Sequence, residues 1–170
     1  MYDPADMPTH AAFLAKDWNP PEYVAKLIAA RRDNPGPVKG MAAVGTTVEE
    51  AKEAQALTCG MITMIDDAVG RVNAANTDAN TVQIFTTDHG DHLGDHQMLF
   101  KGAAQYEEVT RVPFIWADPE DGGHKRTDEI GQTHDIGVTI LERACIEPAH
   151  GMQGQSLFAG GRDAAFIQYE

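Results

Sequence analysis

Apolar positions recur with helical spacing over one long stretch of the chain. Between residues 47 and 75 they fall three or four residues apart, as on one face of an α-helix. Thr47 stands three residues before Glu50, the arrangement of a capping box at a helix N-terminus. The pattern therefore predicts a helix that begins at Thr47 and ends near Ala75.

Shorter patterns predict the remaining elements. Stretches rich in β-branched and aromatic residues, bounded by turn formers, are typical of strands. The predicted strands are Thr81–Thr87, Val112–Trp116 and Ala164–Tyr169, and the further predicted helices are Glu22–Arg32 and Asp135–Cys145, the second capped by Thr133 or His134. Helices alternating with strands favour the α/β class with a mostly parallel sheet.

The same patterns suggest how the chain is organised. Residues 1–46 are rich in proline and predict an irregular excursion around one short helix. Residues 47–157 carry the regular elements, and residues 158–170 carry the start of a further strand. Because that strand has no following element and the first 46 residues provide none beside it, the chain is expected to be one partial domain.

The net charge of the chain argues against several classes of binding partner. The 170 residues hold 26 acidic and 13 basic side chains, which gives a formal net charge of −13. A chain this acidic gains nothing from counterion release, so nucleic acid and anionic membranes are not expected partners. No apolar run approaches the roughly 20 residues that cross a bilayer, and the first residues do not begin a signal peptide. Localisation and oligomeric state stay open.

The densest chemical signal follows the strand predicted at 81–87. Residues 88–96, Asp-His-Gly-Asp-His-Leu-Gly-Asp-His, contain three aspartates and three histidines. Ligands of open α/β sheets bind beyond the carboxyl ends of strands, where Asp88 and His89 fall. A carboxylate and an imidazole there can hold a divalent cation, but a solvated polar loop is an equally open interpretation. The stretch is neither an H-E-x-x-H motif nor an EF-hand loop.

A wider motif carries a resemblance. Thr86–His96 is followed by Leu99-Phe100-Lys101-Gly102, by Tyr106-Glu107 and by Arg111-Val112-Pro113. In letters and spacing this resembles the C-terminal part of the catalytic domain of the sulfatase family, within the alkaline-phosphatase-like superfamily. The resemblance covers roughly Ala56–Leu157. It implies an incomplete alkaline-phosphatase-like α/β fold, whose mixed, mostly parallel sheet has helices on both faces.

The resemblance also implies roles for individual residues. Asp88 and His89 match the family's ligands of a divalent metal, with calcium expected first and magnesium or manganese possible alternatives. Lys101 matches the family lysine that contacts the sulfate group. His92 and His96 match no fixed catalytic position and are interpreted as packing residues of the loop.

The family's nucleophile has no counterpart in this sequence. It is a formylglycine made from Cys or Ser in a C/S-x-P-S-R motif, which Cys59, Cys145 and Ser156 do not match. The resemblance therefore implies a formylglycine in a missing N-terminal part, and a 1–170 chain that is inactive alone. One Asp and one His are also too few ligands for a hard cation, which takes six or more, so weak metal binding is expected.

Three functions remain in view. The first is a sulfuric ester hydrolase that acts, as part of the whole protein, on a small-molecule or saccharide sulfate ester. The second is a phosphonate monoester or phosphodiester hydrolase of the same superfamily. The third is a metal-binding remnant without catalysis.

Overall fold

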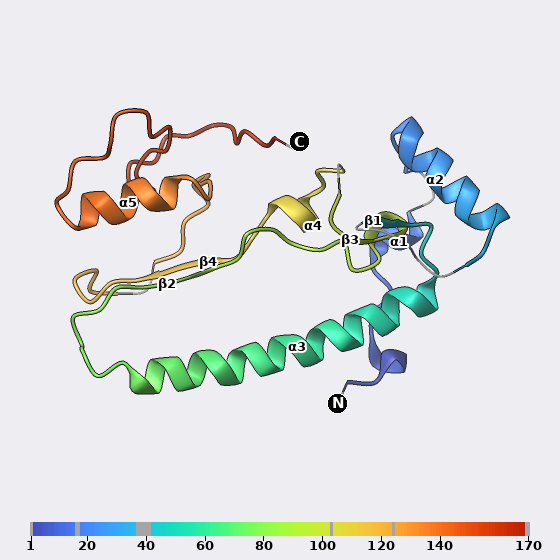
Figure 1. Ribbon diagram of the computed structural model, residues 1–170, viewed down its shortest axis with the longest axis horizontal. Helices are drawn as coiled ribbons and strands as arrows, with labels where there is room; N and C mark the ends of the chain where they lie inside the picture. Colours follow the sequence, from blue (N-terminus) through green and yellow to red (C-terminus); the bar gives the residue numbers. More distant parts are fainter. Residues whose placement is uncertain (1, 16–17, 37–41, 103, 124, 169–170) are drawn as a thin grey trace. The chain divides into compact units, whose positions relative to one another are not determined.

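The computed structural model describes residues 2–15, 18–36, 42–102, 104–123 and 125–168. They belong to two compact units, Met1–Pro119 and Glu120–Glu170 (Figure 1). The helices and strands of the first unit are η1 Pro4–Asp6, α1 Ala11–Leu14, α2 Glu22–Asp33, β1 Ala42–Val44, α3 Val48–Ala75, β2 Gln83–Thr86, η2 Asp95–Gln97, β3 Met98–Phe100, α4 Glu107–Thr110 and β4 Phe114–Ala117. The second unit contains α5 Asp135–Arg143.

Helix α3 confirms the longest sequence prediction (Figure 1). Thr47 is its N-cap, and both bonds of the capping box form: Glu50 N donates to Thr47 Oγ1 at 3.2 Å and Thr47 N donates to Glu50 Oε2 at 3.0 Å. Its buried residues, Ala51, Gln55 and Ala56, all lie in the first three turns. The N-terminal part of α3 is therefore the part that packs into the described core.

Helix α2 packs on the core of the first unit. Val24 is fully buried there with Met98 and Ala104, and Ile28 and Val44 pack around them. Arg31 at the end of α2 donates to Glu50 Oε1 at 2.7 Å, which ties α2 to the start of α3. The predicted irregular excursion thus contributes a helix to the core.

The described strands form two small antiparallel ribbons. β1 pairs with β3, and β2 pairs with β4 in the register Gln83–Ala117 to Thr86–Phe114. The sequence predicts a mostly parallel sheet, and in this respect the described pairings differ from the prediction. Local composition identifies a strand, but its partner and direction depend on contacts distant in sequence. The α/β class and the incomplete character of the domain are as predicted.

Asp135 organises the second unit. Its side chain is 1% exposed and accepts from Gln132 N, Gln155 N and the guanidinium of Arg162 at 2.7 to 2.9 Å. His134, one of the two predicted caps, occupies the N-cap position of α5, but its side chain makes no capping bond to the helix.

Residues 158–168 contain no strand, although a strand is predicted to begin near Ala164. A strand needs a neighbour to accept and donate its backbone hydrogen bonds, and the described part of the chain supplies none there. In the described residues, no helix combines the length and the apolar character that a bilayer crossing requires.

Candidate active site

Asp88 lies two residues beyond the end of β2. Its side chain is 79% exposed, and its Oδ1 accepts from the backbone N–H of His89 at 3.0 Å and from the Thr87 hydroxyl at 3.2 Å. The His89 N–H, followed by the Thr87 hydroxyl, stabilises the carboxylate and lowers the pKa of Asp88 below its ordinary value. Asp88 is therefore a permanently charged, accessible oxygen donor at neutral pH.

The ring of His89 is fixed by its neighbours. Nδ1 lies 2.7 Å from the carbonyl oxygen of Gly90, and Nε2 lies 2.7 Å from Lys101 Nζ. A carbonyl oxygen can only accept, so Nδ1 carries the proton, and Nε2 keeps its lone pair to accept from the Lys101 ammonium. Of the three residues predicted for the site, His89 and Lys101 are thus in direct contact.

The same geometry suits a divalent cation. Asp88 Oδ2 lies 3.3 Å from His89 Nε2, so two atoms with lone pairs lie close together. The positive charge beside them is the ammonium of Lys101. Metal-ligating histidines commonly donate their other ring N–H to a backbone carbonyl, as His89 does to Gly90. In the described residues, no three His, Cys, Asp or Glu side chains gather into a metal-holding group. Asp88 and His89 thus offer two ligand side chains, fewer than the six or more contacts that a hard cation takes.

The backbone that follows His89 is anchored to α4. Gly90 N donates to Val109 O at 2.8 Å, which holds the loop against α4. A Cβ on Gly90 would collide with the carbonyl oxygen of Glu108. Glycine is required here because two stretches of backbone come too close for a side chain.

His92 and His96 pack in the loop, as predicted. The His96 ring stacks on Tyr106 with centroids 4.1 Å apart, and Trp18 lies 4.9 Å from His96. His92 is 2% exposed, contacts Tyr106 edge-on, and has no hydrogen-bond partner for either ring nitrogen in the described structure. Burial lowers the pKa of His92, because its ionised form would lose hydration.

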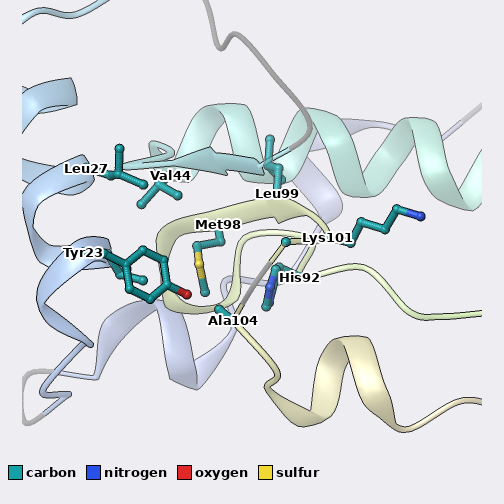
Figure 2. A pocket seen from close by; sticks show the side chains of 10 residues that line it. Tyr23, Leu27, Val44, His92, Met98, Leu99, Lys101 and Ala104 are labelled. Carbon is teal, nitrogen blue, oxygen red and sulfur yellow. The ribbon is translucent and has the colours of Figure 1, made fainter. Parts of the chain in front are cut away.

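A small pocket lies beside the loop (Figure 2). In Figure 2 the Tyr23 ring points toward Met98, whereas the Lys101 side chain points away. The pocket is mostly apolar, with lining residues Tyr23, Val24, Leu27, Val44, His92, Met98, Leu99, Lys101, Gly102 and Ala104. The pocket lies between α2 and the segment around Lys101.

Sequence analysis missed several residues that shape this site. Trp18 and Tyr106 are 88 residues apart, yet the Trp18 indole donates to the Tyr106 hydroxyl at 3.2 Å. Asp91 is part of the recognised motif, but its bonds to the backbone could not be seen from spacing. No local sequence signal reports such contacts, since they depend on how the loop closes.

Comparison with known proteins identifies the family. The Sulfatase family model matches residues 9–146, so the chain belongs to the sulfatase family. It is 32% identical over 166 residues to an arylsulfatase of Clostridium perfringens, covering 92% of this chain and 34% of that protein. It is 37% identical over 121 residues to the multifunctional alkaline phosphatase superfamily protein PehA of Trinickia caryophylli, covering 66% of this chain and 23% of that protein.

A solved structure supports the fold. A crystal structure from Bacteroides thetaiotaomicron, of a protein assigned to the sulfatases, aligns with a TM-score of 0.56 and 24% identity over 71% of this chain and 28% of that one. At this identity the likeness shows the fold alone. The chain therefore carries part of an alkaline-phosphatase-like fold, and it spans 34% and 23% of the lengths of the two curated relatives named above.

Proposed function

We propose that this chain supplies two metal ligands and the sulfate-contacting lysine of a sulfuric ester hydrolase. The observation that supports the proposal is the convergence of Asp88 Oδ2, His89 Nε2 and Lys101 Nζ, with distances of 3.3 and 2.7 Å from the imidazole nitrogen. The substrate is a sulfate ester of a small molecule or a saccharide. The activity belongs to the whole protein, of which this chain provides one part.

Asp88 and His89 are the proposed residues for the divalent metal. The bound metal would act as a Lewis acid toward the sulfate oxygens. Calcium is the first expectation, since Asp88 is a hard oxygen donor, and magnesium or manganese, which also take carboxylate oxygen, are the alternatives. In the neutral ring, the bond from His89 Nδ1 to Gly90 O selects the tautomer that leaves the Nε2 lone pair available to a ligand.

Lys101 is the proposed contact of the sulfate group. Its ammonium carries three N–H donors on a flexible stem, so it can exchange His89 Nε2 for a sulfate oxygen. Hydrolysis of a sulfate ester develops negative charge on the sulfuryl and leaving oxygens. A fixed ammonium offsets that charge in the transition state.

The nucleophile is proposed to be a formylglycine supplied by sequence outside residues 1–170. None of Cys59, Cys145 and Ser156 lies in the required motif. Purified residues 1–170 should therefore give no saturable hydrolysis of a sulfate ester.

The test is an assay of the protein expressed from its complete native reading frame. We expect hydrolysis of p-nitrophenyl sulfate that is faster than hydrolysis of a matched phosphonate monoester. Lys101→Ala should lower kcat on the order of 100-fold, the effect of removing one preorganised donor. Lys26→Ala is the control, because Lys26 lies on α2 and is 74% exposed.

Three results would contradict the proposal. A Lys101→Ala protein with the parent's kcat would remove the catalytic role of this lysine. A complete protein that prefers the phosphonate would favour the alternative hydrolase of the same superfamily. Absence of both activities, in a protein shown to carry formylglycine, would favour the binding remnant.

A further inference from the structure

The residue before Lys101 has an unusual backbone. Phe100 has a φ of +63°, in the left-handed region that non-glycine residues seldom occupy. Its side chain is exposed, so packing of the phenyl ring does not account for the conformation. Strained residues of this kind persist where surrounding bonds hold them, and they concentrate at functional sites.

The bonds that hold Phe100 come from Asp91. Asp91 Oδ1 accepts from the backbone N–H of Phe100 at 2.9 Å and from that of Leu93 at 2.9 Å. One carboxylate oxygen therefore joins Asp91 to Phe100, which lies nine residues further along the chain. A bond from N–H to a charged oxygen is stronger than a neutral one, which suits a contact that holds a strained residue.

A second bond closes the same ring. His92 N donates to Phe100 O at 3.0 Å, so both backbone groups of Phe100 are held by Asp91 and its neighbour. On the other side, Gly90 N is held by Val109 O. The backbone on each side of Asp91 is thereby fixed, and His89 directly precedes the anchor at Gly90 while Lys101 directly follows the anchor at Phe100.

We propose that Asp91 is a positioning residue that places Lys101 against His89. It holds Phe100 in the left-handed conformation, and this conformation directs the next residue, Lys101, toward His89 Nε2. The catalytic meaning of that placement rests on the proposed function above, but the placement itself can be tested without turnover.

The test measures the reactivity of individual lysines in the 1–170 chain. Trace labelling with acetic anhydride, quantified by mass spectrometry, compares Lys101 with the exposed Lys26 in the same sample. An amine that donates to His89 in a half-buried setting should react more slowly than an exposed one. In Asp91→Ala we expect the Lys101 rate, relative to Lys26, to rise about threefold or more, as expected for loss of a hydrogen bond.

Conservative variants separate positioning from charge. Asp91→Asn keeps an oxygen that can accept both N–H groups through weaker, neutral bonds, so its Lys101 rate should lie between that of the parent and that of Asp91→Ala. Asp91→Glu keeps the charge but moves the carboxylate by one methylene, so its Lys101 rate should rise. Asp91→Glu also decides the question if Asp91→Ala does not fold.

Asp95→Ala is the matched control in the same loop. Asp95 Oδ1 accepts from His10 Nδ1 at 3.0 Å and lies in η2, and no bond joins it to Phe100 in the described structure. If Asp95→Ala raises the Lys101 rate as much as Asp91→Ala does, general loosening explains the effect and the proposal is wrong. Unchanged Lys101 reactivity in folded Asp91→Ala or Asp91→Glu would also overturn it. Neither result depends on sulfatase activity, so the proposed function can fail or stand separately.

Discussion

Gly90 is the residue at which backbone packing constrains the site most directly. Its position leaves no room for a Cβ beside the Glu108 carbonyl, and its own carbonyl orients the His89 ring. The residue therefore acts on the site both through the space it leaves and through its acceptor.

Gly90→Ala should destabilise the first unit. The added methyl group meets backbone rather than a movable side chain, so we expect a loss of about 1–3 kcal/mol in the free energy of unfolding. Urea denaturation followed by tryptophan fluorescence measures it, since Trp18 and Trp116 both lie in this unit. Gly60→Ala is the control: it lies inside α3 with nothing within 4 Å, and it should gain up to about 1 kcal/mol. Equal effects of the two substitutions would contradict the close approach at Gly90.

His92 predicts a dependence of stability on pH. Burial lowers its pKa in the folded chain, with partial compensation from Glu108 and Asp91. Between the lowered value and the ordinary value near 6.5, the unfolded chain binds the proton that the folded chain does not. Stability should therefore fall as pH decreases below about 6.5.

The measurement is the free energy of unfolding at pH 7 and pH 5 for the parent and for His92→Leu. The variant should lose less stability on acidification than the parent does. His150→Leu removes an exposed histidine of the other unit and should leave the pH dependence of the first unit unchanged. An identical pH dependence in parent and His92→Leu would show that His92 does not titrate in this way.

The candidate residues were predictable to different degrees. Asp88 and His89 adjoin in the sequence and follow a strand, so their placement together could be predicted from composition and position. Lys101 came only from the family resemblance, because nothing local indicates that it returns to His89. The sequence motif includes Asp91 but does not indicate that it closes the loop, since its hydrogen bond reaches a backbone N–H nine residues away.

At the scale of elements, the strength of the local pattern decided what the sequence could predict: β2 and β4 have four residues each, yet their β-branched and aromatic composition indicated them. The 28 residues of α3 carry many repeats of one apolar period and a capping box, and both were predicted correctly. β1, β3 and α4 have three or four residues each and were missed. Such short pieces have no periodicity to detect, and they form only because tertiary contacts hold them.

Helix α3 also has an exposed apolar stripe. Beyond its first turns, the side chains on one face are more than half exposed, namely Leu57 (65%), Met61 (55%), Met64 (71%), Ile65 (54%) and Val72 (68%). Exposed apolar area of this extent favours association. An apolar face of this length is typical of a helix that packs on a core, and the described chain buries only the beginning of it.

We expect the 1–170 chain to bind an apolar dye such as ANS and to self-associate, and the double substitution Met61→Lys, Met64→Lys should reduce both. Dye fluorescence and sedimentation velocity measure the change. Asp66→Asn, Asp67→Asn is the control on the other side of α3, because it makes the net charge more positive by the same amount. If the control suppresses association equally, charge rather than the stripe is responsible.

At the scale of the whole molecule, the sequence indicated the family but not the pairing of the strands. The motif around residues 86–113 was enough to indicate the family, and the model match over residues 9–146 confirms it. The strand pairing could not be derived in the same way, since each described strand pairs with one far along the chain. The division at residue 119 into two units also had no clear signal in composition.

Glu50 uses its two oxygens for two different partners. Oε2 completes the cap of α3 with Thr47, and Oε1 receives Arg31 from α2. Arg31→Ala should consequently be epistatic with Thr47→Pro, which removes the backbone N–H that donates to Oε2: after either one, Glu50 retains a single partner, and the cost of the second change depends on the first. During evolutionary drift these three positions would be constrained as a group, although no contact between Arg31 and Thr47 is needed.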